Sequence, residues 1–232
     1  TGKTVLENKI NFAYQNKDFY FGLTPSVYED TNKNGHLRHE YLLPLTIEKN
    51  IMASEKYGSL DFGSNMRLRN YETNKQLNLF VNDFNWKSNK WLNTLGIENY
   101  FEGLIKNVNY KAQNIAEYKV DKSNFDLNSA FGYFAKFPLF KEDFIKNNFH
   151  SLTPRFLFRY APGHMRKTNG GRLNYGNLFN LNKLNELDVL EPGLSASIGF
   201  EYKKNKFDNS KNITDEVISF SIGQVVSEKE NM

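Results

Sequence analysis

The sequence predicts an all-β fold, in which roughly ten antiparallel up-and-down strands form part of a transmembrane β-barrel wall. Apolar and polar side chains alternate along most of the chain, as they do on strands that have one apolar face. Aromatic residues make up 15% of the chain, yet the mean hydropathy is only −0.63. This balance fits strands with one face in lipid and the other in a wet interior.

The first half of the chain contains six alternating segments. In the first segment, Leu6, Ile10 and Phe12 fall on one face and Glu7 and Lys9 on the other. The third segment contains Pro44, which has no backbone N–H, so we expect an edge-like or bulged strand there. The fourth segment is the most regular. The six segments span residues 6–15, 19–27, 37–48, 60–69, 77–86 and 95–105.

The second half of the chain contains four more alternating segments. Residues 106–129 form a long polar stretch that we interpret as a loop, and residues 161–192 form a second long connection. The four segments span residues 131–137, 155–160, 194–202 and 218–223. Two long loops at equal parity in the strand count are typical of a barrel whose long loops emerge on one side.

Alternation predicts an apolar face but leaves open whether lipid or a second protein layer covers it. The polar faces favour a hydrated interior, because they carry many charges. We predict that four arginines of these faces point into a barrel lumen: Arg67, Arg69, Arg155 and Arg159. Tyrosines and tryptophans near predicted strand ends are typical of the rings that line membrane interfaces. They include Tyr28, Tyr41, Tyr71, Trp86, Trp91, Tyr100, Tyr110, Tyr160 and Tyr202.

Several classes of function find no support in the sequence. The chain has no Cys, and no apolar run is long enough for a membrane-spanning helix. Its net charge of +4 is spread evenly, without the basic face that nucleic acid requires. Four histidines, His36, His39, His150 and His164, show no metal-ligand spacing. We therefore expect no enzyme, no cofactor, no metal and no nucleic-acid partner.

A series of short motifs between residues 130 and 226 resembles the barrel of the lipopolysaccharide-assembly outer-membrane protein (LptD, OstA/Imp) family. The segment 152–166 contains Pro154 and Pro162, and residues 173–188 contain Phe179 and Asp188. The order and spacing of these pieces carry the resemblance. The pieces in order are Phe137-Pro138-Leu139, 152–166, 173–179, 185–188, 193–199 and Phe220-Ser221-Ile222-Gly223-Gln224.

The resemblance implies a translocon of the bacterial outer membrane that passes lipopolysaccharide from a periplasmic bridge to the outer leaflet. It implies three kinds of partner: membrane lipids, a plug lipoprotein (LptE) and a bridge protein (LptA) that docks on a domain outside this chain. We expect residues 1–232 to be a partial barrel domain, the interior portion of the C-terminal barrel, without the periplasmic jelly-roll or the closing C-terminal strand.

Two alternatives remain open at the level of the sequence. Another outer-membrane channel or receptor barrel shares all the alternation. A secreted β-sandwich that binds a ligand also alternates, but it buries its apolar faces against each other.

Overall fold

The computed structural model describes residues 4–72, 74–118, 123–143, 147–165, 168, 172–207 and 213–228. Within these residues, fourteen strands form one antiparallel sheet. No helix in this part of the chain has the length and apolar character needed to cross a membrane. The strands are β1 (Val5–Lys9), β2 (Phe12–Asn16), β3 (Phe19–Leu23), β4 (Ser26–Asp30), β5 (His39–Ser54), β6 (Gly58–Tyr71), β7 (Lys75–Lys87), β8 (Trp91–Leu92), β9 (Glu98–Gln113), β10 (Ser123–Lys136), β11 (Leu139–Asp143), β12 (Asn148–Ala161), β13 (Gly193–Phe207) and β14 (Ile213–Ser227).

The sheet is an up-and-down meander in which each long strand pairs with the next one along the chain. The order is β1-β4-β5-β6-β7-β9-β10-β12-β13-β14, so the chain crosses the sheet ten times. This path confirms an all-β, up-and-down fold. The sheet is not closed, because β1 and β14 end the path without pairing with each other.

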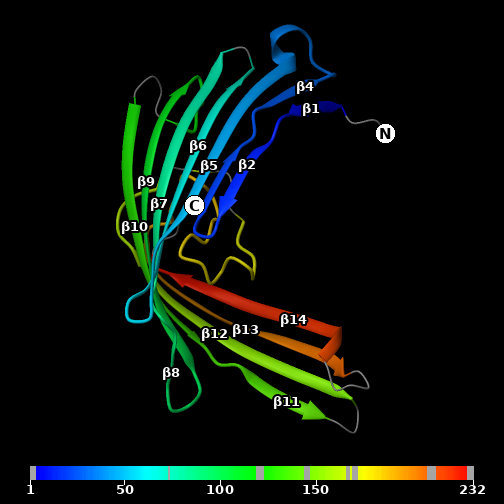
Figure 1. Cartoon of the computed structure of the whole chain (residues 1–232), viewed down its shortest axis with the longest axis vertical. Coiled ribbons are helices and arrows are strands. Elements are labelled where there is room, and N and C mark those ends of the chain that lie inside the picture. The colour runs from blue at the N-terminus through cyan, green and yellow to red at the C-terminus, as the bar shows by residue number, and fades with distance from the viewer. Residues whose placement is uncertain are drawn as a thin grey trace.

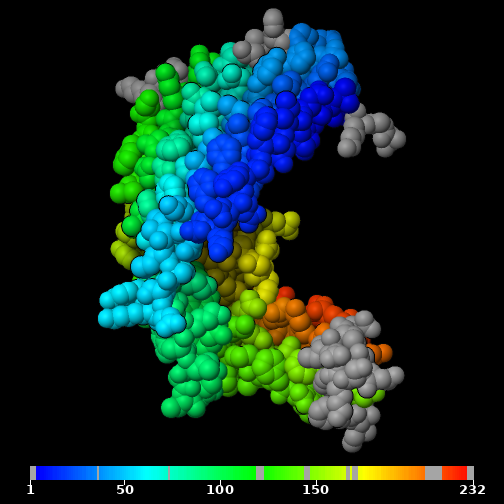
Figure 2. All heavy atoms as spheres, in the orientation of Figure 1, coloured from blue at the N-terminus to red at the C-terminus, as the bar shows by residue number. Residues whose placement is uncertain are grey.

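The sheet curves into a wall around a hollow that is open between the blue N-terminal strands and the red β14 (Figure 1). Residues 172–192, drawn in yellow, lie inside this curve, and the space-filling view shows the same hollow (Figure 2). We call the sheet face that contacts residues 172–192 the inner face, and the opposite face the outer face.

Two prolines explain why some crossings are split into two strands. The carbonyls of Pro44 and Pro154 accept hydrogen bonds from Thr24 and Phe137, at 3.2 and 3.0 Å. The imide nitrogen of each proline therefore faces a neighbour to which it cannot donate, and that neighbour is interrupted there. The interruptions separate β3 from β4 and β10 from β11.

The expectation at Pro44 was wrong in its form. Pro44 lies inside β5, which is paired on both sides, and the register shift between β5 and β6 falls between Asn50 and Met52. Pro154 likewise lies inside β12, although the resemblance places it at a strand opening.

The predicted loop at residues 106–129 was also wrong. β9 continues to Gln113 and β10 begins at Ser123, so most of this stretch is strand. Here the apolar side chains of β9, Val108 and Tyr110, face inward, and Asn107 and Asn109 face outward. Because the apolar side chains change from the outer to the inner face within β9, the sequence pattern does not predict its second half as a continuation of the same strand. Only the connection after β12 is long, so the argument from two long loops does not hold.

The inner face carries the buried core of the molecule. One cluster joins β7, β9 and the turn after β9, and contains Leu79, Val81, Val108, Tyr110, Ala112, Ile115 and Tyr118. A second joins β9, β10 and β12 to residues 181–190, and contains Leu104, Ala130, Phe134, Leu157, Ala161, Leu181 and Leu190. The first cluster is completed by the turn after β9, and the second is completed by residues 181–190.

Candidate functional site

Residues 172–192 pack directly on the inner face because three glycines there leave room for them. A Cβ atom on Gly132 would lie 2.7 Å from Leu181, and one on Gly223 would lie 2.8 Å from Leu178. Gly199, opposite Gly223 in the β13–β14 pair, is also close to Phe179. Because these three glycines have no side chain, residues 172–192 can lie close to the backbone of the sheet.

Three buried cations hold the segment to the sheet. Arg159 donates to the carbonyls of Leu181 and Glu191, at 2.6 and 2.5 Å. Lys106 donates to the Leu187 carbonyl at 2.8 Å and forms an ion pair with Asp83 at 2.8 Å. Their exposed fractions are only 1% and 2%, so these contacts satisfy charges that have lost their water.

The third cation, Lys183, belongs to the segment itself. Its Nζ donates to Ser195 at 3.0 Å and forms an ion pair with Glu191 at 3.0 Å, and its side chain is fully buried. Burial lowers the pKa of the Lys183 ammonium, and the nearby Glu191 carboxylate opposes part of that change. Cations of the sheet therefore donate hydrogen bonds to the segment, and a cation of the segment donates one to the sheet.

The four arginines of the sequence analysis all lie on the inner face, although their surroundings differ. Arg69 forms an ion pair with Glu40 at 2.6 Å, and Arg155 forms one with Glu201 at 3.0 Å. Arg159 is buried beneath residues 181–191, whereas Arg67 is exposed. That this face lines a lumen stays a prediction.

The six motif residues divide between the two faces. Phe179, Asp188 and Gly223 lie on the inner side but at different places: Phe179 packs on the second core cluster, Asp188 accepts a hydrogen bond from Tyr118 at 2.6 Å, and Gly223 lies beneath Leu178. The other three motif residues are not on the inner side. Pro154 and Gln224 are on the outer face of β12 and β14, and Pro162 follows β12 at the surface. Arg166, at the end of the matched segment, lies outside the described residues.

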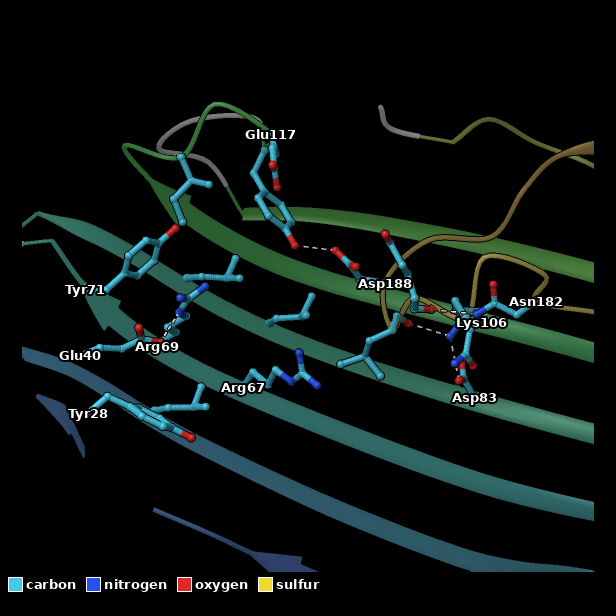
Figure 3. Close-up of a pocket in the computed structure, with 18 residues that line it drawn as sticks. Tyr28, Glu40, Arg67, Arg69, Tyr71, Asp83, Lys106, Glu117, Asn182 and Asp188 are labelled. Carbon is cyan, nitrogen blue, oxygen red and sulfur yellow. Dashed lines mark hydrogen bonds and ion pairs between the residues drawn. The ribbon is translucent and has the colours of Figure 1, made fainter. Parts of the chain in front are cut away.

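A cavity of about 890 Å³ separates β4–β7 from the turn after β9 and from residues 182–188 (Figure 3). Arg67, Arg69 and Lys106 contribute cations to its wall, and Tyr28, Tyr71 and Tyr118 contribute rings. Arg69 also stacks on Tyr71, with its guanidinium carbon 4.0 Å from the ring centroid. The acidic side chains that line the cavity are Glu40, Asp83, Glu117, Glu186 and Asp188.

Some of the expected interfacial aromatics line this inner side instead. Tyr28, Tyr71, Tyr100 and Tyr110 share the inner face with the arginines, and Tyr110 is buried in the first core cluster. A pattern based on closeness to strand ends does not reveal which face a ring occupies, so those four assignments were wrong.

Sequence reasoning missed Lys106, Lys183 and the three glycines beneath residues 172–192. We call these glycines, Gly132, Gly199 and Gly223, the glycine floor. Lys106 lay inside the predicted loop at residues 106–129, and Lys183 lay inside the predicted long connection at residues 161–192. The available signal for Lys106 was a charged residue between two apolar residues, Leu104 and Val108, on the same face of an alternating strand. Gly199 and Gly223 were noticed only as parts of motifs.

Metal binding has no centre among the described residues. No three His, Asp or Glu side chains gather there as ligands for a metal ion. The His150 ring is 2.8 Å from the Tyr202 hydroxyl, and the side chain of His36 lies outside the described set. The arrangement is suited to noncovalent binding of polar groups on the inner face.

No protein-family model and no curated protein matches this chain.

Proposed function

We propose that this chain is part of the wall of an outer-membrane β-barrel that moves lipopolysaccharide to the outer leaflet. The observation that carries the proposal is the contrast between the two faces of a sheet that the chain crosses ten times. An exposed apolar face lies opposite a charged one, as membrane strands between lipid and water require.

The outer face supports the membrane part of the proposal. Large apolar side chains on it remain 40–63% exposed, and the described residues place no second layer over them. An exposed apolar surface of this extent marks contact with lipid or with another protein. They include Phe84, Ile105, Phe131, Phe158, Ile198, Phe220 and Ile222.

Aromatic rings continue across neighbouring strands of this face. Phe62 and Phe84 have ring centroids 5.0 Å apart, and Phe200 and Phe220 are 5.9 Å apart. A secreted β-sandwich would bury such rows against a second sheet. Here the described strands all belong to one sheet, which favours lipid as the neighbour.

The inner face supports the translocation part. Ion pairs cross it from strand to strand, including Arg69–Glu40, Lys87–Glu102, Lys106–Asp83 and Arg155–Glu201. A charged, hydrated surface spares sugar and phosphate groups the cost of entering hydrocarbon, while acyl chains stay in apolar surroundings. The resemblance of residues 130–226 to the LptD family adds the substrate. It also adds LptE and LptA as expected partners.

A channel or receptor barrel for small solutes is a second candidate. The observation that favours it is the packing of residues 172–192 on the inner face, because a segment held there by buried cations narrows the passage beside it. A narrow passage suits a small solute better than a large glycolipid.

Charged substitutions test the membrane part. We expect Phe158→Arg and Ile198→Arg, on the outer face, to reduce insertion into lipid vesicles, because a charge on the lipid side costs about 2–4 kcal/mol near the bilayer centre. Ser221→Arg, on the inner face, is the matched control and should insert normally. Vesicle flotation measures insertion. Equal insertion of all variants, in a chain that stays dissolved without detergent, would favour the secreted module.

Photo-crosslinking tests the substrate in the full-length protein in cells. A crosslinking residue at position 67 should label the saccharide part of lipopolysaccharide, and one at position 158 should not. Solute uptake without any lipopolysaccharide adduct at position 67 would support the channel instead.

A further inference from the structure

The geometry points to a binding site for a saccharide that carries one anionic group, in the cavity between β4–β7 and residues 182–188. This inference rests on the proposed function, because such saccharides are the headgroups that the inner face would meet. It adds the residues that would recognise them. The cavity of about 890 Å³ falls within the range of small-ligand sites.

The cations in the wall give the site its anionic requirement. Arg69 is occupied by Glu40 at 2.6 Å, and Lys106 by Asp83 and the Leu187 carbonyl, each at 2.8 Å. Within the described part of the chain, Arg67 makes no hydrogen bond or ion pair. Figure 3 shows its guanidinium between those two occupied cations. Its planar group of N–H donors matches a phosphate or carboxylate.

Two acceptor atoms in the wall call for a ligand with hydroxyl groups. Asp83 Oδ1 and Asn182 Oδ1 are buried and accept no hydrogen bond from the described residues. Both residues line the large cavity and also an adjoining one of about 330 Å³. A buried acceptor without a donor is costly, and a sugar hydroxyl supplies that donor.

The remaining wall favours a sugar over a simple anion. Five carboxylates surround the cavity, so a bare anion meets more negative than positive charge. Carboxylates have about four acceptor positions each, and hydroxyl groups can fill those that protein donors leave open. The rings of Tyr28 and Tyr71 add flat apolar surface beside the arginines. One anionic group at Arg67, on a body rich in hydroxyls, satisfies all of these features.

Ligand binding to the protein in detergent micelles tests the inference, with glucose 6-phosphate, glucose and inorganic phosphate as probes. Saturation-transfer NMR titrations give the affinities. We expect glucose 6-phosphate to bind more tightly than glucose or phosphate alone. In Arg67→Gln it should bind about tenfold more weakly, as expected for losing a charged hydrogen bond, while glucose binding stays unchanged.

Two further variants complete the design. Asn182→Leu should weaken glucose and glucose 6-phosphate alike, because it removes a hydroxyl partner. Arg155→Gln is the matched control, since Arg155 also lies on the inner face but is outside this cavity, and it should bind like the unaltered protein. Heat-modified gel migration verifies that each variant is folded.

The inference is overturned if glucose 6-phosphate does not bind, if inorganic phosphate binds as tightly, or if Arg67→Gln binds it normally. Vesicle insertion and lipopolysaccharide crosslinking are measured separately. A barrel that passes those tests but fails here keeps its proposed function and loses this site.

Discussion

The two halves of the inner face use the same residue types in opposite ways. On β12 and β13, the segment 172–192 covers the sheet, and Arg159 is 1% exposed beneath it. On β5 and β6, Arg67 is exposed beside an open cavity. One arginine therefore holds the structure together, and the other is available to a ligand. What separates them is the cover, which comes from a distant part of the chain.

The largest expected effect comes from removing the buried arginine. Arg159→Met leaves the carbonyls of Leu181 and Glu191 without their donor, so we expect a loss of about 3 kcal/mol or more in the free energy of unfolding. Arg67→Met, on the same face, should change it by less than about 0.5 kcal/mol. Denaturant unfolding in detergent measures both. If both substitutions lowered the free energy of unfolding by the same amount, the covered and the open half of the inner face would not differ in the role of their arginines.

A smaller effect is expected at the glycine floor. A Cβ atom on Gly199 would lie 2.5 Å from the Ile222 carbonyl oxygen and 3.1 Å from Phe179, so Gly199→Ala should cost about 1–3 kcal/mol through overpacking. Gly63→Ala is the control, because open space surrounds its Cβ position. Limited proteolysis of residues 172–192 should also become faster in Gly199→Ala alone. A tolerated substitution would show that the segment does not depend on close contact with β13.

The smallest effect concerns pH. Because burial lowers the pKa of Lys183 below its ordinary 10.5, the folded protein binds fewer protons than the unfolded chain between these two values. Its free energy of unfolding should therefore gain a positive contribution as the pH rises through that window. When the free energy of unfolding is measured from about pH 8 to about pH 10, its increase with pH should be smaller in Lys183→Met than in the unaltered protein. An unchanged slope would remove Lys183 as the source.

Alternation was sufficient to predict the strands wherever one face is apolar throughout. The segments 60–69 and 194–202 lie within β6 and β13. The four arginines share a face because they stand at the polar positions of the alternating pattern in their strands. Local periodicity carries this information, and it does not depend on distant contacts.

The parts that could not be predicted depend on contacts between distant residues. β9 looked like a loop because its second half turns its apolar side chains toward the interior, under cover from elsewhere in the chain. Lys106 and Leu187 are 81 positions apart, and no local pattern relates them. The difference between Arg67 and Arg159 has the same origin, so the sequence predicted their face but not their roles.

The ten crossings also limit how the open sheet could become a closed one. Since every neighbouring pair is antiparallel, the first and last crossings, β1–β2 and β14, run in opposite directions. Any strands that join these two edges while preserving the antiparallel order must therefore come in an even number, with direct pairing of the edges as the zero case. A barrel that contains this wall has an even strand count whatever its circumference.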